Sequence, residues 1–169
     1  MTTPNIVRQR HITLMRNSVR TLGNILQHVT QEEAASYRDG GDGWTVLEVI
    51  CHLRDYDLIF CNRAQMMLEQ DYADLPGYDH EALATERDYN SQDLSAVYAG
   101  LAESRERFAA FFENLTDEQW TRAGVHPERG HFTMTDAVMQ VGLHDSDHLE
   151  QITRILAEAE AGKPEGIAR

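Results

Sequence analysis

The sequence has few basic residues and no long apolar run. Its 169 residues include 15 Lys and Arg against 28 Asp and Glu, a formal net charge of −13 at pH 7. Proteins that bind nucleic acid neutralise phosphates with clustered Lys and Arg, so an acidic chain without a basic cluster argues against a nucleic-acid partner. No apolar stretch approaches the roughly 18 residues that cross a bilayer, so we expect no membrane segment.

Cysteine is also scarce. Cys51 and Cys61 lie ten residues apart in one predicted helix, about 15 Å along its axis, which is too far for a disulfide within the chain. The first twenty residues carry too many charges for a secretory signal. We therefore predict reduced thiols, a cytoplasmic location and a single domain over residues 1–169.

Proline is limited to four positions, which leaves long intervals where helices can form. In these intervals apolar residues recur every three or four positions, the period of a helix with one buried face. The predicted helices cover about 5–30, 45–70, 91–114 and 134–161. No segment alternates as a strand would, so the predicted class is all-α, and four amphipathic helices most simply form a four-helix bundle.

Capping residues support these boundaries. Thr45 precedes Glu48 by three residues, the spacing of a capping box, and Thr116 precedes Gln119 in the same way. Ser91 is placed to cap the helix 91–114, and Thr133 is placed to cap the last helix. The last helix is expected to end near Gly162, Lys163 and Pro164. The segment 71–90 is too long for a tight turn, so we expect a crossover or a lid-like loop there. This segment carries Tyr72, Pro76, Tyr78 and His80.

The most specific chemical feature is a pair of histidines in the predicted last helix. His144 and His148 are four residues apart and therefore share one helix face. That face includes core positions, and buried imidazoles need polar partners. A metal ion would satisfy both rings. His52, at the core boundary of the predicted helix 45–70, is the leading candidate for a third metal ligand.

The other histidines are weaker candidates. His126 and His131 rank second, because both lie in a predicted loop near the last helix. His11, His28 and His80 are left unassigned. The motif is not the HExxH of zinc proteases, since Asp and Ser follow the first histidine where that motif has its general base.

Residues beside the histidines have two interpretations. Four polar side chains either orient the imidazoles or only face water; they are Asp55, Asp145, Asp147 and Gln151. Cys51 points about 100° away from His52 and is expected to pack in the core. Trp44 and Trp120 are expected to close the ends of the core. Gly142 either allows a neighbouring helix to approach closely or is a tolerated weak position.

Two segments resemble a known family. GWTVLEVICHL at residues 43–53 and HDSDHLEQI at residues 144–152 are similar to the second and fourth helices of the DinB-like, YfiT-related metal-binding bundles. The resemblance covers most of the chain. It implies that His52, His144 and His148 bind a divalent ion, and it places the chain beside thiol-dependent transferases and isomerases whose reactions differ.

These observations favour a metal-dependent enzyme. Three neutral imidazoles would leave a coordination position open, as in catalytic zinc sites. Such a site would activate water or a low-molecular-weight thiol for a thiol transferase, isomerase or hydrolase reaction on a small-molecule substrate. Zinc or nickel is the expected ion, with iron and manganese as alternatives. No catalytic residue is assigned from the sequence.

Two other hypotheses remain open. In one, the protein is a non-catalytic metal-binding bundle of a stress response that acts as a homodimer or through a protein partner. Phe112, beside Phe108 and Phe111, would supply an apolar edge for the dimer. In the other, the histidines bind no metal.

Overall fold

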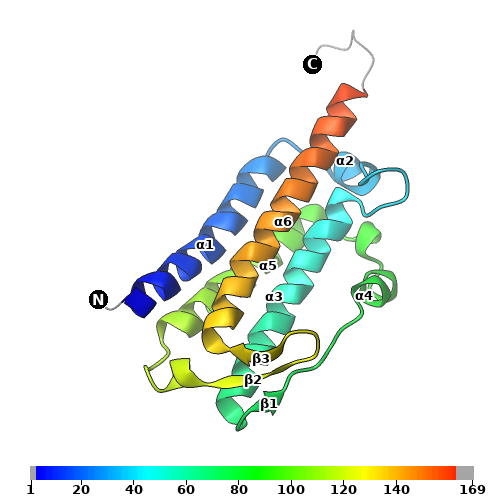
Figure 1. Cartoon of the computed structure of the whole chain (residues 1–169). Coiled ribbons are helices and arrows are strands. Elements are labelled where there is room, and N and C mark those ends of the chain that lie inside the picture. The colour runs from blue at the N-terminus through cyan, green and yellow to red at the C-terminus, as the bar shows by residue number, and fades with distance from the viewer. Residues whose placement is uncertain (1–2, 163–169) are drawn as a thin grey trace.

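The computed structural model describes residues 3–162, and four long helices packed side by side dominate it (Figure 1). They are α1 (Thr3–Leu26), α3 (Val46–Glu69), α5 (Leu94–Glu113) and α6 (Met134–Ala161). This architecture confirms the predicted four-helix bundle. Within the described range, no helix combines the length and the apolar character that crossing a bilayer requires.

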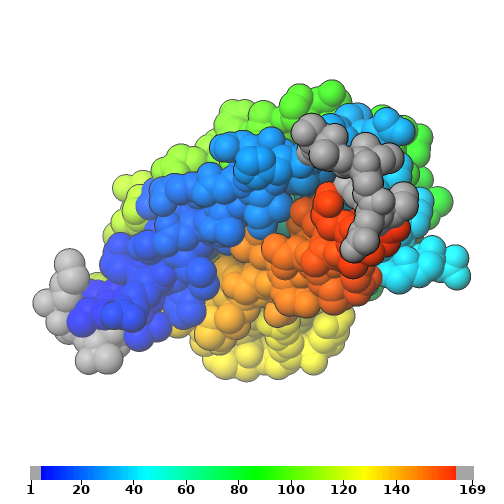
Figure 2. Space-filling view, turned by 90° about the horizontal axis from the view of Figure 1, so that it is seen from above, coloured from blue at the N-terminus to red at the C-terminus, as the bar shows by residue number. Residues whose placement is uncertain are grey.

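The order of the helices around the bundle differs from their order in the chain. α1 packs against α5 and α6, and α3 packs against the same two helices. α3 and α6 are therefore neighbours although they are far apart in sequence. Figure 2 shows α1, in blue, lying along the orange length of α6. At that contact a Cβ on Gly142 would come within 2.6 Å of Leu14 Cδ2, which confirms that this glycine allows close helix approach.

The predicted helix boundaries are close to the observed ones, with two differences. The first helix ends at Leu26, not near residue 30, because Thr30 forms the capping box of a separate short helix, α2 (Gln31–Ser36). α5 begins at Leu94 behind the cap Asp93. Its predicted cap, Ser91, instead ends a 3-10 turn, η1 (Tyr89–Ser91). At the far end, α6 stops before Gly162, and the predicted stop signals Lys163 and Pro164 lie outside the described residues.

The capping predictions at Thr45, Thr116 and Thr133 are confirmed. The Thr45 hydroxyl accepts from the Glu48 amide, and the Glu48 carboxylate accepts from the Thr45 amide at 2.7 Å. Thr133 forms the same reciprocal pair with Asp136. Thr116 and Gln119 bond in both directions before the 3-10 turn η2 (Gln119–Thr121).

The prediction that the chain has no strand is wrong. A small sheet of β1 (Ala73–Asp74), β2 (Ala123–His126) and β3 (Gly130–Thr133) lies where α3 ends and α6 begins (Figure 1). β1 pairs parallel with β2, and β2 pairs antiparallel with β3. Strands of two to four residues are too short to show a period in the sequence. Gly124 fits here because a Cβ would lie 2.5 Å from the Ala73 carbonyl oxygen.

The connection 71–90 contains β1 and the helix α4 (His80–Glu86), and it runs into η1. It links α3 to α5 and runs along one side of the bundle in Figure 1. Asp79 caps α4 by accepting from the amides of Glu81 and Ala82. The connection is therefore a structured crossover.

The buried apolar residues form two clusters. One contains Met15, Phe60, Phe108 and Val141, and the other fills the opposite half of the bundle. Buried polar residues stand between the two clusters along each long helix, and they are Ser18, Asp57, Ser104, Arg105 and Asp145. A polar layer thus crosses the middle of the core.

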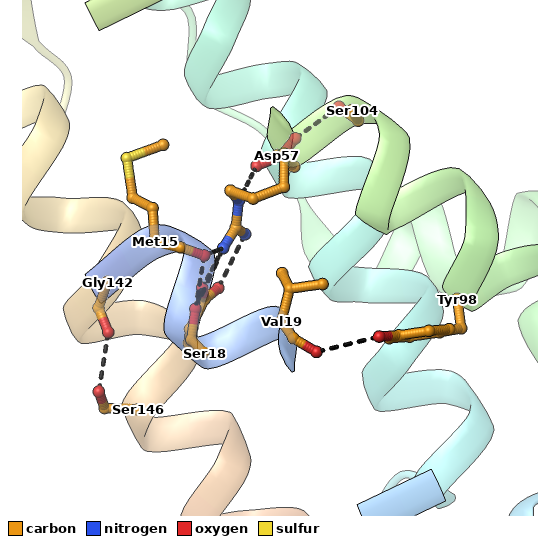
Figure 3. A network of polar contacts seen from close by, with 10 residues as sticks. Met15, Ser18, Val19, Asp57, Tyr98, Ser104, Gly142 and Ser146 are labelled. Atoms are coloured by element: carbon orange, nitrogen blue, oxygen red, sulfur yellow. Dashed lines mark hydrogen bonds and ion pairs between the residues drawn. The ribbon is translucent and has the colours of Figure 1, made fainter. Parts of the chain in front are cut away.

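Arg105 is the centre of this layer. Figure 3 shows this network of polar contacts and labels Met15, Ser18, Asp57 and Ser104 among its members. Its Nε donates to Asp57 Oδ1 at 2.6 Å, its Nη1 donates to the Met15 carbonyl at 2.9 Å, and its Nη2 donates to Asp145 Oδ1 at 3.1 Å. Nη1 also pairs with Asp145, and the Ser18 hydroxyl donates to the same carboxylate. Burial opposes the charge of Arg105, but Asp145 and Asp57 outweigh it and raise its pKa. One guanidinium therefore joins all four long helices.

Replacing Arg105 with methionine should lower the free energy of unfolding by about 3–5 kcal/mol, because two buried carboxylates lose their counter-ion. Urea unfolding followed by circular dichroism measures the change. Arg107→Met is the matched control two residues away, because Arg107 is exposed and pairs with exposed Glu103; its effect should stay within about 1 kcal/mol. An equal decrease in the free energy of unfolding in the two variants would contradict a stabilising role for the buried network.

Candidate metal centre

Three histidines converge beside the polar layer. His52 comes from α3, and His144 and His148 come from successive turns of α6. One ring nitrogen from each residue lies within 4.8 Å of the others, and the Nε2 atoms of His52 and His144 are 2.9 Å apart. His52 is 5% exposed, and the other two are partly buried. The structure therefore brings together the three residues that were predicted from the sequence as metal ligands.

Burial keeps two of these imidazoles neutral. It lowers the pKa of His52 to about 3, with further lowering from the charges of His148 and His80. It lowers the pKa of His144 to about 2, helped by His148 and His52. A neutral imidazole is the form that ligates a metal.

The donor set fits a metal ion that accepts imidazole. Two neutral rings face each other through nitrogens that hold at most one proton between them. His52 Nδ1 is buried and has no hydrogen-bond partner among the described residues. Protein contacts alone therefore leave this cluster incompletely satisfied, whereas an ion that accepts nitrogen lone pairs would use the converging atoms.

A chain of polar contacts orients His148. Its Nδ1 lies 2.8 Å from Gln151 Oε1, and Gln151 Nε2 donates to Asp39 Oδ2 at 2.9 Å. Asp39 is held in turn by Arg154. Because the Gln151 amide nitrogen is committed to Asp39, its oxygen faces the ring and accepts from Nδ1–H. Nε2 of His148 then carries the free lone pair.

A cavity of about 590 Å³ opens onto the three histidines. Tyr56 and Trp44 form part of its wall, with ring centroids 4.2 Å and 5.0 Å from that of His52. Trp44 packs against the core as expected, but it also lines the cavity, and its Nε1 donates to Glu81 at 3.1 Å. Trp120 does close the core, where it stacks on Phe112.

The remaining histidines lie outside the trio. His126 is buried in the cavity wall, with Nε2 3.0 Å from Arg63 Nη1. His131 contacts the Tyr72 hydroxyl through Nδ1 at 2.9 Å. His80 lines the cavity, with its ring centroid 6.2 Å from that of His52. His11 on α1 and His28 just after it do not line the cavity.

The flanking polar residues divide by what they contact. Gln151 orients an imidazole, as described. Asp55 instead accepts from Arg54, Arg87 and Tyr89. Asp145 belongs to the Arg105 network, and Asp147 is exposed.

The prediction that Cys51 packs in the core is confirmed, whereas the predicted phenylalanine edge is not found. Cys51 is fully buried, and burial raises its thiol pKa to about 12, which suits a packing residue. Phe108 and Phe112 are also buried, and Phe111 is partly buried. The expected apolar edge for a dimer is therefore absent at Phe108 and Phe112.

The sequence interpretation missed several cavity residues. Arg63 and Tyr78 line the cavity, as does Arg129 from the turn between β2 and β3. A signal for Arg63 existed, because Tyr56, Phe60 and Arg63 continue the face of His52 at helical spacing. Arg129 carried no such signal, since its position depends on the short strands.

Residues 18–152 match the DinB superfamily, and the chain belongs to this family. It is 32% identical over 120 residues to YfiT of Bacillus subtilis, named as a candidate metal-dependent hydrolase; this match covers 70% of the chain and 66% of that protein. A second protein with that description, from Oceanobacillus iheyensis, is 27% identical over 155 residues, which are 89% of the chain and 87% of that protein.

Solved structures show the same fold. The structure of Bacillus subtilis YfiT, described as a probable metal-dependent hydrolase with an unusual four-helix bundle topology, has a TM-score of 0.83 at 25% identity. It covers 95% of this chain and 90% of that one. The mycothiol-dependent maleylpyruvate isomerase has a TM-score of 0.70 at 15% identity, over 93% of this chain and 71% of that one. At that identity the likeness concerns the fold alone.

The metal-free protein should lose stability as the pH falls from 6.5 towards 4. His52 and His144 have depressed pKa values when folded but take up protons near pH 6.5 when unfolded. The unfolded state therefore binds more protons in this window, and each histidine contributes a slope that approaches about 1.4 kcal/mol per pH unit. Chemical denaturation at a series of pH values measures the slope.

The double variant His52→Gln/His144→Gln should flatten this dependence between pH 6.5 and 5. His131→Gln, which replaces an exposed histidine of β3, is the control and should leave the slope unchanged. A slope that is the same in the wild type and the double variant would contradict the burial of neutral imidazoles.

Proposed function

We propose that this protein is a metal-dependent hydrolase in which His52, His144 and His148 hold one divalent ion. The observation that carries the proposal is the convergence of three imidazoles at a cavity large enough for a small molecule. Three protein ligands with a position left for water or substrate are typical of catalytic zinc sites. The names of the curated relatives support hydrolysis as the reaction.

The donor chemistry selects among metals. An all-imidazole set suits zinc, nickel and iron better than manganese, which prefers oxygen ligands. Zinc or nickel is the proposed ion, with iron as the alternative. When bound, it would supply a Lewis acid that lowers the pKa of a water molecule, or of a thiol in the alternative reaction.

The protein's own residues prepare the site in two ways. Gln151 holds His148 with its Nε2 lone pair free, through the contacts to Asp39 and Arg154. Tyr56 stands against His52 in the cavity wall, and burial raises its phenol pKa. Its hydroxyl therefore stays protonated near neutral pH and is available to donate a hydrogen bond to a substrate oxygen.

Metal analysis tests the ligand set. Protein purified without a histidine tag should bind about one zinc or nickel ion per chain, and His144→Ala and His148→Ala should each weaken binding at least about tenfold. His131→Ala, an exposed histidine outside the trio, should keep wild-type metal content. Equal metal content in the wild type and in both ligand variants would refute the site.

Turnover assays test the reaction. Zinc-loaded and nickel-loaded protein should hydrolyse members of a panel of esters, amides and phosphate esters, and the rate should fall with His148→Ala. A parallel panel pairs low-molecular-weight thiols with electrophiles. Metal-dependent thiol transfer without hydrolysis would favour the thiol-dependent alternative. A metallated protein with no turnover in either panel would favour a non-catalytic bundle that acts as a homodimer or through a partner.

Gln151→Leu should weaken metal affinity by about 10–100-fold, because His148 loses the acceptor that orients its ring. Competition with a chromophoric chelator measures the affinity. Glu150→Leu is the adjacent control, since Glu150 is exposed and pairs only with Arg154 among the described residues; its affinity should stay near that of the wild type. An unchanged affinity in Gln151→Leu would show that the contact does not orient the ligand.

A further inference from the structure

The cavity contains a buried arginine that has no carboxylate partner. Among the described residues, the buried arginines are Arg105 and Arg63, which are 2% and 6% exposed. Arg105 is neutralised by two buried carboxylates. Arg63 has no acidic oxygen within ion-pair distance in the part of the chain that the structure describes. It lines the cavity instead.

Neutral groups contact only some of the N–H groups of the Arg63 guanidinium. Nε and Nη2 donate to the Pro76 carbonyl at 3.1 Å and 2.6 Å, and Nη1 lies 3.0 Å from His126 Nε2. A guanidinium has five N–H groups. These three contacts leave one N–H on each terminal nitrogen for another acceptor.

Buried charge is costly without a counter-ion. Burial lowers the pKa of Arg63, yet an arginine stays protonated at neutral pH. Arg129, which is exposed at the rim of the cavity, adds a second positive charge. Glu128 lies on the same rim, but it is exposed and forms no ion pair within the described residues. This end of the cavity therefore lacks a buried negative charge.

We infer that Arg63 binds a carboxylate of the substrate, with Arg129 assisting at the rim. A carboxylate supplies one negative charge and two acceptor oxygens, which match the two unoccupied N–H groups. The inference rests on the proposed function, because it concerns the substrate of the same cavity. It adds a substrate class, namely acidic small molecules.

The spacing along α3 also defines the shape of that substrate. His52, Tyr56, Phe60 and Arg63 all line the cavity from one face of the helix. Eleven residues of helix separate the first and last backbone positions by roughly 16 Å. The arginine side chain shortens this span as it points back towards the helix start. The substrate is therefore elongated, with its reacting bond at the histidines, an apolar middle against the two aromatic rings, and a carboxylate at the far end.

Binding to the metal-free full-length protein tests this inference without any need for turnover. The probes are 4-phenylbutyrate and its neutral amide, 4-phenylbutanamide, which have nearly the same shape. Isothermal titration calorimetry should show that the wild type binds the carboxylate at least about tenfold more tightly than the amide. Arg63→Gln should bring the two affinities close together. Arg107→Gln, an exposed arginine outside the cavity, should preserve the preference.

Equal affinities in the wild type, or a preference that survives in folded Arg63→Gln, would overturn the inference. If Arg63→Gln does not fold, Arg129→Gln decides, because its exposed side chain is outside the core. A weaker preference in Arg129→Gln supports the subsite, and an unchanged one overturns it. Tighter binding of phenyl phosphate than of 4-phenylbutyrate would overturn the choice of carboxylate. Because binding is measured without metal, a carboxylate preference combined with no turnover in the assays of metal-loaded protein would refute only the proposed function. Hydrolysis by the metal-loaded protein without a carboxylate preference would refute only this inference.

Discussion

The buried ion pairs of Arg105 are the constraint on which the rest of the structure depends. A guanidinium in the middle of an apolar core is tolerated only with its carboxylates in place, so Asp57 and Asp145 must meet it at one level of the bundle. This requirement aligns α3, α5 and α6 along their axes. Asp145 adjoins His144 in sequence, so the turn of α6 that faces the arginine also carries the histidine that meets His52.

Two buried arginines of this fold differ in the groups that they contact. Arg105 is neutralised within the protein and has a structural role, whereas Arg63 is held by the Pro76 carbonyl and a histidine nitrogen and keeps unused donors. The contacts to Pro76 also attach the crossover 71–90 to α3. The segment that covers one side of the bundle thus helps to hold the cationic end of the cavity in place.

Much of the site could be predicted because its histidines stand at positions whose helix face can be inferred from their spacing. Two histidines four residues apart share a face in any helix, and His52 follows its capping box closely enough for its face to be inferred. The roles of Arg63 and Trp44 in the cavity were harder to predict. An arginine near the end of an amphipathic helix is usually solvated, and a tryptophan before a helix usually packs in the core. Only the crossover and the short sheet enclose the space that both residues line.

By itself, the sequence determined the helical class, the capped starts of α3 and α6, and the identity of the three converging histidines. These features follow from local periodicity and from hydrogen bonds within a few residues. The tertiary structure decided that α3 and α6 are neighbours, that Arg105 is buried between Asp57 and Asp145, and that the chain from 71 to 133 forms a sheet and a cavity wall. Those features depend on contacts between segments that are distant in sequence. A local sequence pattern therefore does not indicate which buried arginine will form an ion pair with a carboxylate.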